Sequence, residues 1–342
     1  MTNSIANAPA NGPRFASSIT ADELTRYLRR GGAPRPWRHL PEDKPWVIGP
    51  AAPYGRLERW RKSQTNPFTP MPPLPKRACV LYHEAFKVYD AMAFAMRQGI
   101  IFNAHLTFVW RFAGVGTADH ATELLTKFNH EAGKWLARSL KPDTAYKCHD
   151  VRSKLPGTRH TYVAVHEQGD RQGFHTHELA FIPPAKLPAF RAWAESCLAR
   201  LAGRPYLPAP TLKITGGRLK SSEQQCWRHW RWFRYITKTT VPEAMVRIGG
   251  RLVPVRSIFE PYPFHSGGAV DCAQMNSISH DIGPRAQRLA GFVSKVHRGE
   301  FDSLYDSSYF DEWCAEQDWA RAQADECARQ DEMAFTLMSL DT

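Results

Sequence analysis

Apolar and polar positions follow two different periods along the chain, and these periods predict a mixture of helices and strands. Apolar residues recur every three to four positions in four segments, which is typical of amphipathic helices: residues 80–98, 119–140, 187–201 and 221–239. Shorter runs rich in β-branched and aromatic residues predict strands at 100–110, 161–167, 174–182 and 212–215. Only six residues, two of them glycines, separate the second strand from the third, so we expect these two strands to form a hairpin.

The two ends of the chain differ from this middle part. Eleven prolines fall within residues 33–76, and proline cannot continue a helix or a central strand. Residues 1–76 are therefore expected to form a largely irregular arm. After residue 240 the pattern predicts strands over 246–259, around a Gly-Gly pair, and a basic helix over 284–297.

The composition excludes several classes of protein. A hydrophobic fraction of 43% is too high for a wholly disordered chain, and the longest apolar run, residues 91–96, is too short to cross a bilayer. The start of the chain shows no secretory pattern. The seven cysteines stand singly, without a Cys-x-x-Cys pair, which argues against a disulfide scaffold or a cysteine-only zinc finger and favours a reducing cytoplasm.

Charge is distributed unevenly along the chain. The formal net charge is +12, yet the segment from Glu300 onward contains 12 acidic residues and only two basic ones, Arg321 and Arg329. Residues 1–299 therefore carry 43 basic and 21 acidic side chains. A body this basic, in a chain with 11 tryptophans, predicts a polyanionic partner, most simply a nucleic acid. The alternative is a basic protein that has no such partner.

The predicted hairpin combines imidazole and carboxylate side chains in a way that is typical of a metal site. Because strand residues alternate between the two faces, His175 and His177 point the same way. A register that pairs odd-numbered with odd-numbered residues places Glu167 beside them, on a face that apolar side chains continue into the core. Two imidazoles and one carboxylate suit a divalent metal with open positions for substrate oxygens. The alternative is that this common His-x-His spacing binds no metal.

Two further histidines lie on the predicted strands. His166 points to the opposite face in this register, so we do not expect it to be a ligand. His105 shares a face with Thr107, and we expect it to be packed or hydrogen-bonded rather than a metal ligand.

Residues 227–238 form the densest basic and aromatic stretch of the chain. In a helix, Arg228, Arg231, Tyr235 and Lys238 fall within a stripe of roughly 80°, while apolar residues form a second stripe that would face the core. Positive charge near Tyr235 would favour the phenolate, which is the better nucleophile, and the same cations would hold a phosphate. The alternative is an ordinary amphipathic helix with solvated arginines and an exposed tyrosine.

Together these two sites resemble a known superfamily, the HUH endonucleases, and within it the single-tyrosine rolling-circle replication initiators of plasmids and phages. Residues 174–179, Phe-His-Thr-His-Glu-Leu, match the His-x-His motif of that family, and residues 235–238, Tyr-Ile-Thr-Lys, match its Tyr-x-x-Lys motif. The strand at 103–108 loosely resembles its first, threonine-containing motif. One departure is Thr176, where the family usually has a hydrophobic residue. Another is the lack of a second tyrosine four residues from the first, which argues against two-tyrosine strand transfer.

The resemblance implies an α+β fold with a central antiparallel sheet and flanking helices. The match covers about residues 100–240 and implies an HUH nuclease domain over 77–240. Together with the proline and charge patterns it gives four expected regions: the arm over 1–76, this nuclease domain, a basic accessory DNA-binding region over 241–299, and an acidic, partly helical tail over 300–342.

The reaction implied by the resemblance is a metal-assisted nick of single-stranded DNA at a replication origin. His175, His177 and Glu167 would hold Mg²⁺ or Mn²⁺, and imidazole ligands favour Mn²⁺. Tyr235 would attack the scissile phosphate, forming a 5′-phosphotyrosine link and freeing a 3′-OH, while Lys238 would neutralise the phosphate. The side chains expected to contact the DNA are Arg228, Arg231, Arg234 and Thr107.

Two other functions stay open on the sequence: a single-tyrosine HUH transposase, and a non-catalytic nucleic-acid-binding protein that uses the basic and aromatic helix. The expected partners are single-stranded DNA, the origin duplex and a host helicase or polymerase, but not a membrane, and the expected location is the cytoplasm. Cations of the accessory region are expected to bind the duplex: Arg247, Arg251, Arg256, Arg285, Arg288 and Lys295. The acidic tail either folds back on the basic body and competes with DNA, or acts as a solubilising or partner-binding segment.

Overall fold

A computed structural model of the 342-residue chain describes residues 76–77, 80, 82–138, 159–169, 172–217, 219–240, 244–248, 251–262, 270–271 and 275–340. The arm expected over 1–76 lies outside these residues except for Lys76. Within the described part the protein has an α+β fold built on a five-stranded antiparallel sheet. The fold class and the antiparallel sheet are as expected, but the fifth strand, at residues 276–278, was not predicted.

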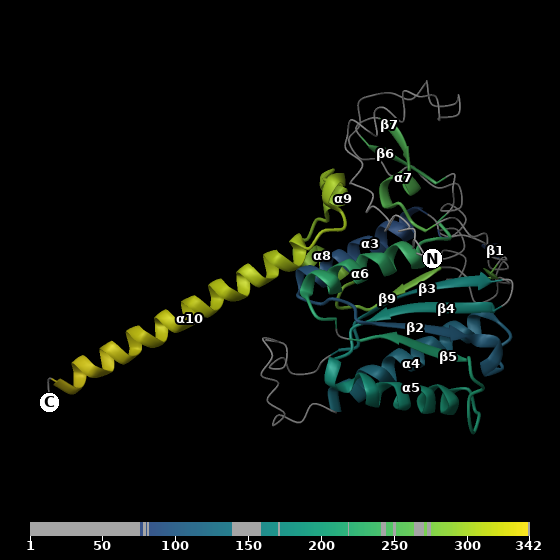
Figure 1. Ribbon diagram of the computed structural model, residues 1–342, viewed down its shortest axis with the longest axis horizontal. Coiled ribbons are helices and arrows are strands. Elements are labelled where there is room, and N and C mark those ends of the chain that lie inside the picture. Colours follow the sequence, from purple (N-terminus) through teal and green to yellow (C-terminus); the bar gives the residue numbers. More distant parts are fainter. Residues whose placement is uncertain are drawn as a thin grey trace, which may run out of the picture.

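The sheet has the strand order β5-β2-β4-β3-β9 (Figure 1). Its strands are β2 (Ala104–Val109), β3 (Tyr162–Gly169), β4 (Gly173–Ala180), β5 (Leu212–Gly216) and β9 (Asn276–Ile278). The predicted hairpin is β3–β4, and β4 occupies the centre of the sheet, with β2 and β3 on either side. The edge strand β9 comes from the segment expected to form the accessory region, so that segment contributes directly to the sheet.

Helices cover both faces of the sheet (Figure 1). Those on one face are α3 (Tyr82–Arg97) and α6 (Ser222–Ile236), and those on the other are α4 (Ala118–Arg138) and α5 (Leu187–Leu201). The strand period of two divides the core accordingly. Odd-numbered residues of the hairpin, such as Val165 and Leu179, pack with α3 and α6, whereas even-numbered ones, such as Ala164 and Ala180, pack with α4 and α5.

Helix α6 buries the apolar stripe that its sequence predicts. Ser221 caps its N-terminus by accepting a hydrogen bond from the backbone N–H of Gln224, at 3.2 Å, and Trp230 and Phe233 are buried against α3. The helix ends at Ile236 rather than at residue 239. Lys238 therefore lies in the turn after the helix, and its position depends on that turn.

Two expectations beyond residue 240 are wrong. Strands β6 (Met245–Ile248) and β7 (Arg251–Pro254) pair as predicted, but residues 255–259 form a short helix, α7 (Val255–Phe259), instead of continuing the strand. Its buried residues recur at helical rather than strand spacing. The basic helix expected over 284–297 is broken into α8 (Pro284–Leu289) and α9 (Lys295–Arg298), because Gly291 between them adopts a left-handed conformation with φ +61°.

The remaining elements are short. They are β1 (Lys76–Arg77), which pairs with β8 (Val270–Asp271), and three 3₁₀ turns: η2 (Trp110–Ala113), η4 (Pro184–Lys186) and η5 (Phe301–Ser303). None of the described helices combines the length and the apolar character needed to cross a membrane.

The acidic tail forms one long helix, α10 (Ser308–Leu340), which is attached to the body only near its start (Figure 1). Tyr309 is buried, Glu312 Oε2 pairs with Arg97 Nε at 3.1 Å, and the indole of Trp313 covers Gly99 closely enough to exclude a Cβ atom there. Over residues 318–333 almost every side chain is exposed, and the helix runs away from the body. The described part of the tail therefore does not fold back over the sheet.

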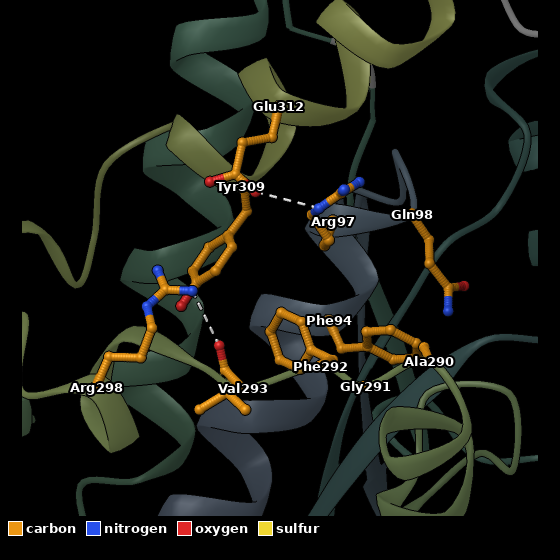
Figure 2. A pocket seen from close by; sticks show the side chains of 10 residues that line it. All are labelled: Phe94, Arg97, Gln98, Ala290, Gly291, Phe292, Val293, Arg298, Tyr309 and Glu312. Atoms are coloured by element: carbon orange, nitrogen blue, oxygen red, sulfur yellow. Dashed lines mark hydrogen bonds and ion pairs between the residues drawn. The ribbon is translucent and has the colours of Figure 1, made fainter.

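A pocket of about 400 Å³ lies where α3, the α8–α9 loop and the start of α10 meet (Figure 2). Phe94, Phe292 and Tyr309 supply its aromatic lining. Its two arginines already have acidic partners: Arg97 pairs with glutamates of α10, and Arg298 pairs with Glu300 at 2.7 Å. The pocket thus has balanced charge and is separate from the hairpin site.

Candidate metal and tyrosine site

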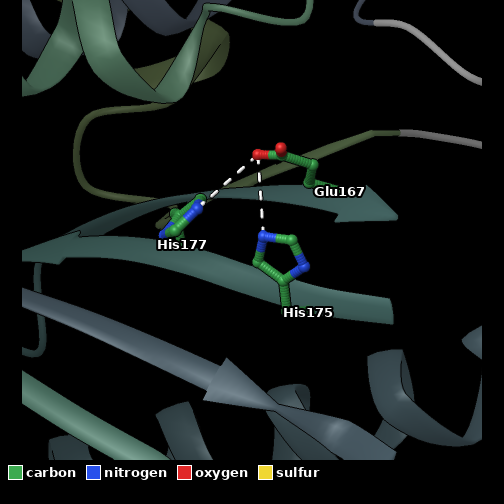
Figure 3. A group of neighbouring side chains, drawn as sticks. All are labelled: Glu167, His175 and His177. Carbon is green, nitrogen blue, oxygen red and sulfur yellow. Dashed lines mark ion pairs between the residues drawn. The ribbon is translucent and has the colours of Figure 1, made fainter. Parts of the chain in front are cut away.

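Glu167, His175 and His177 form a compact, buried group on the β3–β4 hairpin (Figure 3). The strands pair Glu167 with His175 and Val165 with His177, which is the odd-with-odd register that the sequence predicts. Glu167 Oε2 lies 3.7 Å from His175 Nε2 and 3.6 Å from His177 Nε2, and the three ligand atoms lie within 4.8 Å of one another. Within the described residues this is the group of histidine and acidic side chains arranged to hold a metal ion.

The outer nitrogen of each imidazole has its own partner. His175 Nδ1 donates to the carbonyl oxygen of Gly173 at 2.9 Å, which leaves the Nε2 lone pair facing Glu167. His177 Nδ1 lies 3.1 Å from His105 Nε2 and 3.3 Å from Thr107 Oγ1. His177 Nε2 itself is buried and has no hydrogen-bond partner among the described residues. An unpaired, buried nitrogen that faces a carboxylate fits a bound cation.

Lys238 supplies a positive charge at this position. Its Nζ donates a hydrogen bond to Glu167 Oε2, the same oxygen that both imidazoles approach. Burial alone would raise the pKa of the Glu167 carboxyl, but the nearby ring nitrogens of His175 and His177 and the ammonium group of Lys238 hold this pKa far below its usual range. The carboxylate is therefore ionised at neutral pH.

The imidazole of His177 is in the form that binds metals. Burial lowers the pKa of His177 to about 4, so its ring is neutral at physiological pH. One ionised carboxylate and two imidazoles fit a divalent transition-metal ion such as Mn²⁺ better than the hard, octahedral Mg²⁺. The arrangement would leave further coordination positions for oxygens of a substrate.

Tyr235, on α6, lies against this group, about sixty residues further along the chain. Its ring meets the ring of His177 edge to face, with centroids 5.1 Å apart, and that of His105 at 5.7 Å. Lys238 Nζ lies 4.3 Å from the centroid of the Tyr235 ring. The tyrosine, the lysine and the histidine pair, which sequence reasoning connected only through motif order, therefore form one site.

The expectation that cations favour the Tyr235 phenolate is wrong for this structure. Burial and the charge of Glu167, together with Tyr262, raise the pKa of the Tyr235 hydroxyl above its ordinary value. The nearest cation, Lys238, is engaged with Glu167 and does not offset these effects.

The three arginines of α6 that were expected to contact DNA have partners within the protein. The guanidinium of Arg228 donates to the backbone carbonyl of Gly217, and Arg234 Nε donates to that of Glu260 at 2.6 Å. Arg231 Nε donates to the hydroxyl of Tyr262 at 2.8 Å. Of the three arginines expected to contact DNA, only Arg231 is exposed, while Arg228 and Arg234 hold neighbouring backbone in place.

The strand faces match the sequence reasoning for the remaining residues. His166 Nδ1 and Thr176 Oγ1 form a hydrogen bond of 2.8 Å on the opposite face, where Trp110 Nε1 also donates to Thr176 at 2.7 Å. His105 is hydrogen-bonded, as expected. Thr107, which lies on β2 with His105, also contacts His177. Sequence reasoning missed Tyr262, whose ring centroid lies 5.9 Å from that of Tyr235, because no motif or spacing marks it.

Two of the cations expected to bind a DNA duplex point inward instead. Lys295 is buried and pairs with Asp306 at 2.7 Å. Arg256 donates to the backbone carbonyls of Lys238 and Thr240, and so supports the turn that carries the site lysine. Arg285 and Arg288 are exposed.

Comparisons with known proteins identify no relative from which a function could be inferred for this site. No protein-family model, no curated protein and no solved structure matches the chain.

Proposed function

We propose that this protein is a metal-dependent nickase of single-stranded DNA that attacks a phosphodiester with Tyr235, as an HUH replication initiator does. The observation that carries the proposal is the contact between the Tyr235 and His177 rings, at 5.1 Å, beside a buried Glu-His-His group. The contact places the side chain that carries the nucleophile beside the candidate ion site, as attack on an ion-bound phosphate requires.

Each side chain has a distinct task in this proposal. Glu167, His175 and His177 would hold Mn²⁺ or Mg²⁺, which when bound would withdraw electron density from a non-bridging phosphate oxygen. Tyr235 Oη forms a bond to phosphorus while the bond from phosphorus to the 3′ oxygen breaks. The phenol loses one proton and the departing 3′ oxygen gains one, so no water is consumed and the reverse reaction can rejoin the strand.

The electrostatics explain why an ion would be needed. The charge of Glu167 helps to raise the pKa of Tyr235, so neutralising that carboxylate removes part of the barrier to deprotonating the phenol. Once Glu167 is otherwise engaged, Lys238 is free to turn toward the phosphate. Its position, with Nζ 4.3 Å from the centroid of the Tyr235 ring, would let it stabilise negative charge that develops during attack.

The surface next to the site suits an unpaired strand. Trp227 is 38% exposed on α6, and the guanidinium of Arg231 lies 5.0 Å from its ring centroid. Such cation and aromatic pairs stack nucleobases and contact phosphates with little sequence preference. This surface also supports the non-catalytic binding alternative, so binding alone does not test the nickase.

The decisive experiment is a covalent-adduct assay. Purified protein is incubated with a pool of single-stranded oligonucleotides and Mn²⁺, and the DNA–peptide adduct is mapped by mass spectrometry. We expect an adduct on Tyr235 that is lost with chelator, with Tyr235→Phe and with His175→Ala/His177→Ala.

Tyr262→Phe is the matched control, since it removes a neighbouring tyrosine hydroxyl and keeps the ring. An adduct that persists in Tyr235→Phe and disappears in Tyr262→Phe would identify Tyr262 as the nucleophile instead of Tyr235. Tight DNA binding without any adduct, at every metal tested, would leave the non-catalytic alternative as the function. Joining of two element ends by the same tyrosine would favour the transposase.

A further inference from the structure

His105 is a residue of this site to which the proposed reaction assigns no task. It lies on β2 beside the His-x-His strand, with its ring directed toward α6. Its Nε2 lies 3.1 Å from His177 Nδ1, a shorter contact than the 3.3 Å from Thr107 Oγ1 to the same nitrogen. His177 thus has another imidazole as its nearest outer partner.

The imidazole that contacts His177 Nδ1 differs in kind from the backbone carbonyl that contacts His175 Nδ1. The carbonyl of Gly173 can only accept, so it keeps the proton of His175 on Nδ1 at all times. An imidazole nitrogen can donate or accept, according to the tautomer of its ring. The contact between His105 and His177 can therefore run in either direction.

The two directions suit two states of the site. Without an ion, His177 Nε2 faces the Glu167 carboxylate at 3.6 Å, which favours a proton on Nε2 and leaves Nδ1 to accept from His105. With an ion, Nε2 must offer its lone pair, so the proton moves to Nδ1, which then donates to His105. Each ring keeps one proton throughout, and the hydrogen bond between the rings is retained.

We propose that His105 is the positioning residue for His177. The direction of the hydrogen bond between the two rings reverses when a metal ion binds to the site. This inference rests on the metal site of the proposed function but not on the nicking reaction. It predicts that His105 contributes to ion affinity although it is not a ligand.

The proposal is tested by comparing the divalent-ion affinity of the full-length protein with that of single-residue variants. Mn²⁺ binding is measured by calorimetry for wild type, His105→Leu, His105→Gln and Thr107→Val, with His130→Leu on the exposed side of α4 as a matched control. Loss of such an outer partner typically weakens metal binding by about 10- to 100-fold. We expect a loss of this size in His105→Leu, a smaller one in Thr107→Val, and partial recovery in His105→Gln, whose amide can also donate or accept.

The tautomer of His177 gives a second measurement. It would not respond to the His105 substitution if His105 only supported the fold. In ¹⁵N NMR spectra, addition of diamagnetic Mg²⁺ should shift the His177 proton from Nε2 to Nδ1 in the wild type. In His105→Leu the shift should be smaller at the same Mg²⁺ concentration. Thermal melts establish that each variant is folded, and His105→Gln keeps the test valid if His105→Leu does not fold.

The outcomes separate this inference from the proposed function. Equal Mn²⁺ affinity in wild type and His105→Leu, or a His177 tautomer that does not respond to the ion, overturns the role of His105 and leaves the nickase untouched. A protein that binds Mn²⁺ through His105 as described but forms no DNA adduct overturns the nickase alone. A wild type that binds no divalent ion overturns both.

Discussion

Lys238 occupies the cation position of the site, and this leads to an unusual expectation: removing a positive residue should make the protein bind a metal ion more tightly. Lys238 donates to Glu167 Oε2, and the two side chains are only 12% and 6% exposed. A bound ion and the ammonium group would compete for the same oxygen. Lys238→Met removes the charge while keeping most of the length of the side chain.

The magnitude follows from the short contact. Two unit charges about 4 Å apart interact by about 4 kcal/mol at an effective dielectric constant of 20. Only part of this energy opposes ion entry, because the ammonium group can turn away from Glu167. An effect of about 1.4 kcal/mol corresponds to Mn²⁺ binding that is about tenfold tighter in Lys238→Met. Breaking a buried pair from one side also costs about 3–5 kcal/mol, so the ion-free variant should be less stable.

Calorimetric titration with Mn²⁺ and thermal melts with and without the ion measure both effects. We expect tighter binding, a larger ion-induced rise in the melting temperature and slower nicking in Lys238→Met. Lys220→Met, which removes an exposed lysine just before α6, controls for the change in net charge. Weaker or unchanged binding in Lys238→Met would show that the lysine supports the ion rather than competing with it, and would refute the reasoning.

Three further predictions concern the fold. Burial lowers the pKa of His166 to about 4 and that of His229 to about 3, so the unfolded chain binds more protons below pH 6.5. These two side chains together should therefore lower the free energy of unfolding by about 3 kcal/mol from about pH 7.5 to about pH 5.5, and denaturant unfolding with equal midpoints would contradict this. Asn103 exchanges two hydrogen bonds with the backbone of Ile182, at 2.6 and 2.9 Å, and Asn103→Ala should cost about 2–4 kcal/mol in the same assay. Removal of residues 318–342 should leave the melting temperature and the Mn²⁺ affinity unchanged, because side chains over 318–333 are almost all exposed; a lower melting temperature would reveal a contact of this segment with the body.

The hairpin was predictable because its information is local. The alternation of faces along two adjacent strands places Glu167, His175 and His177 on one side without any knowledge of the remaining fold. The same alternation correctly places His166 and Thr176 on the other side. For such short-range geometry the sequence pattern was sufficient.

Contacts between distant segments were not predictable in this way. The pKa of Tyr235 depends on Glu167, which is distant in sequence, and the arginines near it are held by backbone carbonyls that no pattern identifies. The prediction of one helix over 284–297 was wrong for a different reason. Gly291 adopts a left-handed conformation, which ends the helix despite the helical propensity of its neighbours. The functional proposal itself stays a prediction until the adduct assay is performed.

The division of the site between a hairpin and a helix has a mechanical consequence. The three side chains proposed to hold the ion lie within 11 consecutive residues of one hairpin at the middle of the sheet, whereas the phenol is carried by a separate helix. A small sliding of that helix would lengthen or shorten the path from hydroxyl to phosphate and leave the grip on the ion intact. If the proposed function holds, ion affinity and the rate of attack could therefore change independently of each other.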